Sequence, residues 1–360
     1  ISWLFLIMLS APIAQYSTKL GPFDFFSLVL LALVLIASIG GKSMSRSFFS
    51  ASLGVLAALP GIDTATGNLR ITFGFEELNG GLKLLPVLIG MFAISQIISD
   101  ISRIGDKITI ISVKRKRDML FKWEDWKKNA INLVRSSVIG TGIGILPGIG
   151  ANIGSVTAYS TARSLATTED KKKFGKGSET GIVAAEAANN ATIGGSLIPL
   201  ISLGIPGSVI DAILLGGLLI HGLQPGPLLF QQNPEMVYTI MGSMFVANVF
   251  MFFFMILSVR YLARLASIPR GLLMPVILVF CIVGSFALST RMFDVWTMLF
   301  FGLLGFAFER FKIPLAPFVI GFILAPIAEE NLLMGLMASN GSYLPIVQQP
   351  VSLLFVIVSI

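Results

Sequence analysis

Charged residues are scarce in this sequence of 360 residues: Asp, Glu, Lys and Arg make up 12% of it, against roughly 25% in ordinary soluble proteins. Hydrophobic residues make up 54%, and the mean hydropathy is +0.85. Charge-free stretches such as 25–41 and 271–289 have the length of a membrane span, about 17 to 25 residues. The composition therefore predicts an all-α polytopic membrane protein and excludes nucleic-acid binding as its main function.

Cysteine and histidine occur once each, as Cys281 and His221. A single cysteine excludes an intramolecular disulfide framework. A single histidine argues against a zinc site built from histidines, and no HExxH motif occurs. The GxGD, GxSG and DDxxD patterns of membrane-embedded enzymes are also absent. We therefore expect no cofactor and no enzymatic activity.

Both ends of the sequence lie inside apolar runs, and the first residue is Ile1 rather than Met. This pattern favours a fragment of a longer protein.

Lys and Arg residues indicate the topology, because short cytoplasmic loops are rich in them. If the loop 101–136 is cytoplasmic, alternating spans place all but four of the 26 Lys and Arg residues on that side. The candidate membrane segments are 1–16, 25–41, 45–60, 82–100, 137–162, 181–223, 236–259, 271–289, 292–309, 313–328 and 344–360.

Segment 137–162 is flanked on both sides by basic loops, so it has to enter and leave on the same face. It contains six glycines and the pair Pro147-Gly148 near its middle, and both residue types favour a break in a helix. The sequence therefore predicts a re-entrant hairpin of two half-helices that meet at residues 146–150.

Segment 181–223 is too long for one span, since 43 residues of helix would extend about 64 Å. Pro199 and the run Gly204-Ile205-Pro206-Gly207-Ser208 mark the predicted break. Two interrupted segments in one chain are typical of a transporter binding site.

Residues that follow the two breaks are candidates for substrate binding. The spans from 137 to 259 have no Lys or Arg outside the basic loop at 163–176, so an anion there would depend on helix N-termini and small polar groups. Ordinary glycine packing between membrane helices is the alternative. The candidates are Pro147, Gly148, Gly150, Asn152, Ser155, Gly204, Pro206, Gly207 and Ser208.

Glu186, Asn189 and Asn190 share one face of a predicted helix. A carboxylate with two amides could bind Na⁺ or carry H⁺, so this trio is the candidate site for a coupling cation. The alternative is that Glu186 lies near the membrane interface and is simply solvated. Asp211 is interpreted as a helix cap and His221 as an interfacial histidine.

Three stretches resemble the large membrane subunit of tripartite tricarboxylate transporters, the TctA family. They are GIDTATGNLRITFGFEELNGGLKLLPVLIGMFAIS (61–95), GIGILPGIGANIG (142–154) and the long stretch 174–230, which contains EAANNA, LGIPGS and HGLQPGPLLF. The combination is specific, and the resemblance extends over essentially the whole chain.

The resemblance implies a secondary transporter in the prokaryotic inner membrane that imports citrate-like tricarboxylates or related carboxylates, driven by a Na⁺ or H⁺ gradient. It also implies two partners, a small membrane subunit and a periplasmic solute-binding protein. Members of the family are longer and have two homologous halves. The glycine-proline motif of their first half is missing here, which again indicates an N-terminally truncated chain.

The predicted fold has about ten transmembrane segments, a re-entrant hairpin and a broken helix, and corresponds to the C-terminal part of a two-repeat transporter. Four regions are expected: helices between the repeats (1–100), a basic cytoplasmic loop with an amphipathic segment (101–136), the core transport region (137–230) and C-terminal helices (231–360). An ion channel, a membrane-embedded enzyme and a non-functional remnant remain alternative interpretations.

Overall fold

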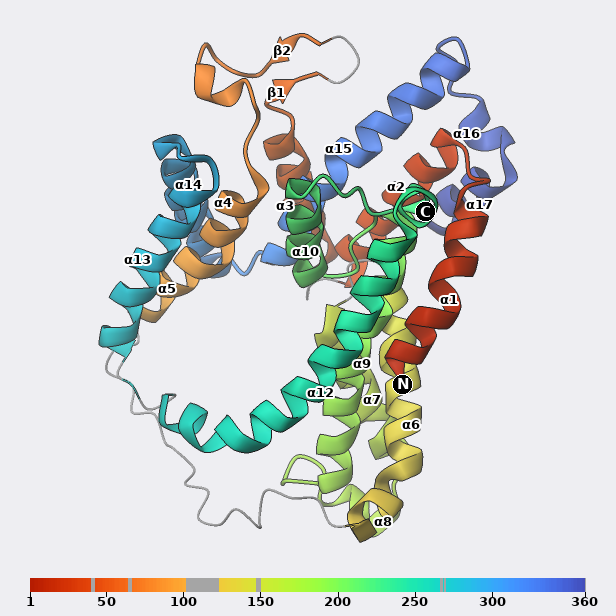
Figure 1. The fold of residues 1–360 in the computed structure, drawn as a ribbon, viewed down its shortest axis with the longest axis vertical. Coiled ribbons are helices and arrows are strands. Elements are labelled where there is room, and N and C mark those ends of the chain that lie inside the picture. The colour runs from red at the N-terminus through yellow and green to blue at the C-terminus, as the bar shows by residue number, and fades with distance from the viewer. Residues whose placement is uncertain are drawn as a thin grey trace. The chain divides into compact units, whose positions relative to one another are not determined.

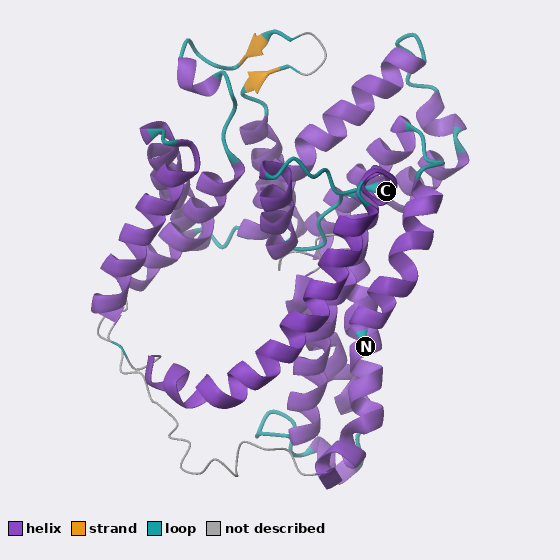
Figure 2. Ribbon diagram, viewed as in Figure 1, coloured by secondary structure: helices purple, strands orange, loops and turns teal. Residues whose placement is uncertain are grey.

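The fold was analysed in a computed structural model, which describes residues 1–39, 43–63, 67–101, 123–146, 150–265, 268 and 270–359. Helices dominate these residues (Figure 2). The chain forms two compact units. Unit 1 comprises Ile1–Gln15, Gly105–Ser208 and Leu223–Pro269, and unit 2 comprises Tyr16–Ile104, Val209–Gly222 and Arg270–Ile360.

Unit 1 is built around three helices, α6, α7 and α9, which pack against one another (Figure 1). Most of α1 also belongs to this unit. The elements of unit 1 are α1 (Ser2–Ser17), α6 (Trp123–Ile145), α7 (Gly150–Leu165), α8 (Thr168–Lys171), α9 (Glu179–Leu203), α11 (Pro227–Gln232) and α12 (Pro234–Leu265).

Unit 2 contains two packed groups of helices. In one group α2 packs against α3, α15 and α17; in the other α14 packs along the continuous run α4–η2–α5, with α13 beside it (Figure 1). The elements of unit 2 are α2 (Pro22–Ile39), α3 (Met44–Ala58), β1 (Gly61–Ile62), β2 (Leu69–Arg70), η1 (Glu76–Leu78), α4 (Leu84–Leu88), the π-helix η2 (Ile89–Ile94), α5 (Ser95–Ile101), α10 (Val209–Ile220), α13 (Arg270–Ser289), α14 (Met292–Arg310), α15 (Leu315–Ala338), α16 (Pro345–Gln348) and α17 (Pro350–Ser359).

The all-α membrane class predicted from composition is confirmed. In the described part of the chain, four helices are long and apolar enough to cross a membrane: Leu84–Ile101, Pro234–Ser258, Met292–Arg310 and Leu315–Ala338. Four further apolar helices are shorter: Pro22–Ile36, Ile210–Ile220, Gly271–Ala287 and Pro350–Ser359. The count of about ten spans stays a prediction.

The break predicted in segment 137–162 is present. Helix α6 ends at Ile145 and α7 begins at Gly150. The first helix is longer than predicted, because it begins at Trp123. The amphipathic segment that contains Trp123 and Trp126 is therefore continuous with the first arm of the hairpin. The most basic part of the predicted loop 101–136, the run Lys114-Arg115-Lys116-Arg117, lies outside the described residues.

The break in segment 181–223 lies at residues 204–208, between α9 and α10, as predicted. The expectation that Pro199 contributes to the break is wrong, because Pro199 lies inside α9. The helix continues to Leu203 and ends at Gly204, which has a left-handed φ of 74°. The amide of Gly204 donates to Leu200 O (3.0 Å) and that of Ile205 to Pro199 O (3.3 Å). These bonds satisfy terminal carbonyls of α9, and the one from Gly204 to Leu200 is the 5→1 bond of the αL motif.

The β-hairpin of unit 2 was not predicted. Strands β1 and β2 pair antiparallel, with Gly61 opposite Arg70. Arg70 forms a bidentate ion pair with Glu329 of α15, in which Nη2 lies 2.6 Å from Oε2, and a second ion pair with Asp63. The hydrogen bond and charge of Glu329 raise the pKa of Arg70 above its ordinary value. This ion pair joins the hairpin to α15.

Candidate functional site

Helices α6 and α9 approach each other closely enough for their backbones to touch. A Cβ added at Gly140 would collide with the Ala188 backbone, and one at Gly195 would collide with the Thr141 backbone. At Gly144, near the end of α6, an added Cβ would lie 2.9 Å from Ser196 N. Close approach through small residues is how membrane helices associate in the absence of a hydrophobic driving force.

The predicted break at 204–208 packs on the end of this pair. Residues Gly204 to Gly207 are buried, and Ser208 is partly buried. A Cβ added at Gly207 would lie 3.0 Å from Gly144 O and 2.7 Å from the Cβ of Ser196. The end of the first hairpin arm and the break in the second interrupted segment therefore meet in unit 1.

The second hairpin arm, α7, begins at Gly150, where φ is 73°. Such a left-handed conformation favours glycine. Asn152, in the first turn, is exposed, and Ser155 Oγ donates to Ala185 O of α9 (3.1 Å). Ser155 therefore has a structural partner in addition to any ligand. Pro147 and Gly148 lie outside the described residues.

Two hydroxyl residues at this junction escaped the sequence analysis. Ser196 touches the break through Gly207, as described above. Thr192 lies one turn earlier on α9, and its Oγ1 is 2.5 Å from the Cβ position of Gly154 on α7. Both are buried, and Thr192 Oγ1 donates to Ala188 O (2.8 Å). Ala188, Thr192 and Ser196 follow one another at intervals of four residues and therefore share one face of α9. This spacing is the feature of the sequence that could have identified the two hydroxyl residues.

The three residues of the candidate cation site lie on α9, but only Asn189 is partly buried. Glu186 and Asn190 are exposed. Their spacing of four residues places them on the face of α9 that also exposes Ile182 and Ile193. The structure therefore places Glu186 and Asn190 on an exposed side of α9, away from the junction with α6, whereas Asn189 is partly buried. Asp211 is buried in the first turn of α10, and His221 is exposed just after its end, where Nδ1 lies 2.8 Å from Gly217 O.

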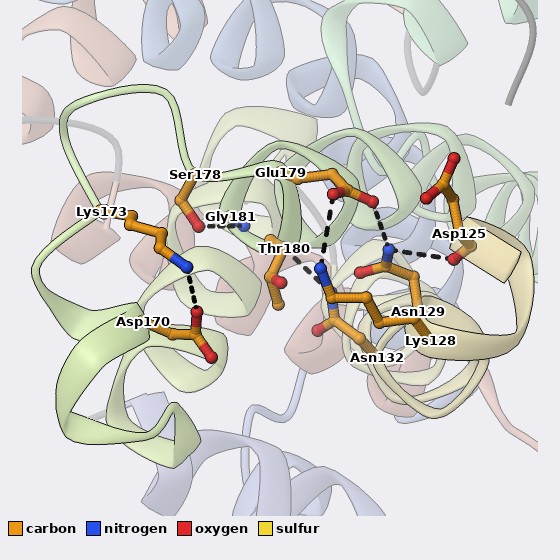
Figure 3. Close-up of polar contacts among 10 residues, drawn as sticks. All are labelled: Asp125, Lys128, Asn129, Asn132, Asp170, Lys173, Ser178, Glu179, Thr180 and Gly181. Carbon is orange, nitrogen blue, oxygen red and sulfur yellow. Dashed lines mark hydrogen bonds and ion pairs between the residues drawn. The ribbon is translucent and has the colours of Figure 1, made fainter. Parts of the chain in front are cut away.

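Polar side chains join the N-terminal parts of α6 and α9, at the far end of both helices from the junction (Figure 3). Asn129 Nδ2 donates to Glu179 Oε1 (2.7 Å), and Asn132 Nδ2 donates to Thr180 O (2.9 Å). The Nζ of Lys128 lies 3.6 Å from Glu179 Oε2. Asn129 and Asn132 are buried, so these bonds fix how α9 begins against α6.

A second polar contact in the same view stabilises the short helix α8 (Figure 3). Lys173 Nζ lies 2.8 Å from Asp170 Oδ1, and Thr167 Oγ1 donates to Asp170 Oδ2 (3.0 Å). These two hydrogen bonds, that from Lys173 first, lower the pKa of Asp170. The same ion pair raises the pKa of Lys173.

Comparison with known proteins decides which family the chain represents. Residues 1–320 match the sequence profile described as the tripartite tricarboxylate transporter TctA family. The chain belongs to this family. The TctA family is a family of transporters, and its large subunits span the membrane several times, in agreement with the apolar helices of both units.

Two relatives come from Agrobacterium vitis. One, named "Uncharacterized 52.8 kDa protein in TAR-I ttuC' 3'region", is 29% identical over 352 residues, which cover 98% of this chain and 69% of the relative. The other, named "Uncharacterized protein in TAR-II ttuC' 3'region", is 30% identical over 213 residues, which cover 59% of this chain and 87% of the relative. No solved structure matches the chain.

Proposed function

We propose that this TctA-family subunit is the carrier component of a secondary transporter that imports tricarboxylates such as citrate, or related carboxylates, across the prokaryotic inner membrane. A Na⁺ or H⁺ gradient drives this uptake. A periplasmic solute-binding protein delivers the substrate, and a small membrane subunit completes the complex. The proposal is supported by family membership together with one structural observation, the contact of the hairpin end at Gly144 with the break at Gly207.

The junction is suited to a carboxylate because of its chemistry. Helix α7 begins there, and the first turn of a helix presents unpaired N–H groups and about half a positive charge. Asn152 adds an exposed amide in that turn, and Ser208 adds a hydroxyl after the break. The remaining candidates in the described part of the chain are Gly150, Ser155, Gly204, Pro206 and Gly207, and the sequence adds Pro147 and Gly148 from the predicted turn.

Uptake of labelled citrate into proteoliposomes tests the substrate proposal. The vesicles would contain the complete large and small subunits, with the binding protein outside, with and without an inward Na⁺ gradient. Saturable, gradient-dependent accumulation is expected. Uptake that does not saturate and shows no counterflow would instead indicate a channel.

Asn152→Ala and Ser208→Ala test the position of the substrate site. Each removes a polar group from the junction, and a lost hydrogen bond to a charged ligand corresponds to about 1.5–3 kcal/mol, roughly a tenfold to hundredfold rise in KM. Ser164→Ala is the matched control, since Ser164 lies exposed near the other end of α7. Unchanged kinetics in both junction variants would exclude the junction as the substrate site.

Glu186, Asn189 and Asn190 are the proposed contribution of α9 to cation coupling. The exposed position of Glu186 and Asn190 allows an ion to reach them from solvent or from a partner subunit. We expect Asn190→Ala to shift the Na⁺ or pH dependence of uptake. An unaltered dependence would leave these residues as a solvated face of α9.

A further inference from the structure

A buried polar cluster joins α2 and α17 within unit 2, away from the residues discussed above. Asp24 lies in the first turn of α2, and its side chain is only 7% exposed. Gln349 is the residue between α16 and α17. A Cβ added at Gly21 would lie 3.7 Å from Asp24 Oδ2 and 3.9 Å from Gln349 Oε1. The two side chains therefore converge beside Gly21.

Each of these side chains has a buried oxygen that lacks a donor. Asp24 Oδ2 accepts a hydrogen bond from Gly21 N (2.9 Å), as in a capping box. In contrast, Asp24 Oδ1 and Gln349 Oε1 have no hydrogen-bonding partner among the described residues. A buried polar atom without a partner is destabilising, and an unpaired buried charge is more so. Two acceptors without a donor in one cluster, one of them on a carboxylate, need a positively charged group or a donor.

The hydroxyl groups one turn further along cannot act as this donor. Ser352 Oγ donates to Ile346 O (2.8 Å), which uses its only hydrogen. Ser27 Oγ lies 2.7 Å from Ser352 Oγ, so Ser27 must be the donor in that contact. Both hydrogens are thus used, whereas the Ser27 oxygen can still accept. The cluster as a whole is rich in acceptors.

The charge of the cluster also favours a cation. Asp24 carries one negative charge, and the N-terminus of α2 offsets only about half of it. No ion pair reaches Asp24 within the described part of the chain. Asp294 provides the comparison, because it is also buried in the first turn of α14 and its Oδ2 also lacks a partner, but Arg291 Nη2 lies 3.7 Å from its Oδ1. Asp24 lacks such an internal counter-charge.

We propose that Asp24 and Gln349 form a binding site for a monovalent metal cation, with Na⁺ as the ion of best fit. The atoms that would bind the ion are all oxygens, which are the ligands that hard cations prefer. A single carboxylate matches one positive charge, whereas Ca²⁺ takes six to eight oxygen ligands and usually more than one carboxylate. The ion bridges Oδ1 of Asp24 and Oε1 of Gln349 and thereby joins α2 to α17.

Sodium-dependent thermal stability of the intact subunit in detergent tests the site without any transport step. The melting temperature would be measured in NaCl against choline chloride at equal ionic strength. A ligand that binds the folded state raises the melting temperature with its concentration. We expect this rise in the wild type, and an apparent Na⁺ affinity about tenfold or more weaker in Asp24→Asn. Asp294→Asn is the matched control and should keep the wild-type response.

Gln349 provides the second line of the test, should Asp24→Asn fail to fold. Gln349→Ala removes one ligand and should weaken the Na⁺ response, whereas Gln349→Glu adds a carboxylate oxygen and should retain or strengthen it. If the amide of Gln349 instead donates to Asp24 through Nε2, Gln349→Glu places two carboxylates together and lowers stability at every Na⁺ concentration. That result overturns the proposal.

Two other results would also overturn the proposal. A Na⁺ response lost in Glu186→Gln but kept in Asp24→Asn places the ion on α9. A wild-type melting temperature that depends on pH but not on Na⁺, through Asp24, identifies a proton site instead. Because no uptake is measured, failure of the proposed carboxylate transport would leave this test unaffected. A role of the ion in coupling rests on the proposed function.

Discussion

Replacing Gly140 with alanine is expected to weaken the packing of α6 against α9. The new Cβ would lie 2.7 Å from the Cα and 2.9 Å from the carbonyl carbon of Ala188, and closer still to its carbonyl oxygen. All three atoms belong to the backbone, so they cannot rotate away and the helices must separate. Overpacking of this kind costs about 1–3 kcal/mol. The higher helix propensity of alanine offsets roughly 0.5–1 kcal/mol of that.

Gly142 provides the control that separates these two effects. It lies in the same helix, but a Cβ added there would meet nothing within 4 Å. Gly142→Ala should therefore gain the helix propensity without a clash and be as stable as the wild type, or slightly more. The difference in unfolding free energy between the two variants isolates the steric effect, about 1–3 kcal/mol.

Denaturant or thermal unfolding of the purified variants in detergent, followed by circular dichroism, measures this difference. Gly140→Ala should melt at a lower temperature than both Gly142→Ala and the wild type. Equal stability of the two alanine variants would refute the backbone contact between α6 and α9, and with it the placement of the hairpin end against the break at 204–208.

The remaining predictions concern two ion pairs, Arg70–Glu329 between the β-hairpin and α15, and Asp170–Lys173 at α8. Glu329→Gln should destabilise unit 2 by about 1 kcal/mol, since Arg70 and Glu329 are partly buried and hydrogen-bonded to each other. Arg70→Lys should not preserve the bidentate geometry. A double-mutant cycle of Arg70 and Glu329 that gives no coupling energy would contradict this prediction. The pKa of Asp170 is lowered by Lys173 and Thr167, so its stabilisation is present above the ordinary range of aspartate and is lost as the pH falls through the lowered pKa. The protection of the Asp170 amide, which donates to Thr167 Oγ1, from hydrogen exchange, measured relative to an unstructured amide at the same pH, should therefore fall in acid in the wild type, and Asp170→Asn should remove this acid dependence.

Local features of the sequence predicted the two breaks. Glycine and proline act through the backbone of their own residues, so the run 204–208 and the pair Pro147-Gly148 could be read without knowledge of neighbours. The same reasoning failed at Pro199, which α9 accommodates in its interior. A proline constrains its own turn, but whether the helix continues depends on the packing around it.

Candidate residues of the site were only partly predictable. Asn152 and Ser208 follow breaks and were found for that reason. Thr192 and Ser196 were missed, because their place at the junction depends on which face of α9 packs against α6 and α7. The exposure of Glu186 and Asn190 depends on the same choice of face, which the sequence leaves open.

The sequence by itself determined the membrane class, the helical content and the positions of the breaks, because hydropathy and backbone preference are properties of each segment. Only the tertiary structure decided which distant segments meet. Arg70 and Glu329 are separated by 259 positions, and Ser27 and Ser352 by 325. Apolar helices present many equivalent faces, so their pairing is settled by shape and by a few buried polar contacts that exist only once the helices have packed.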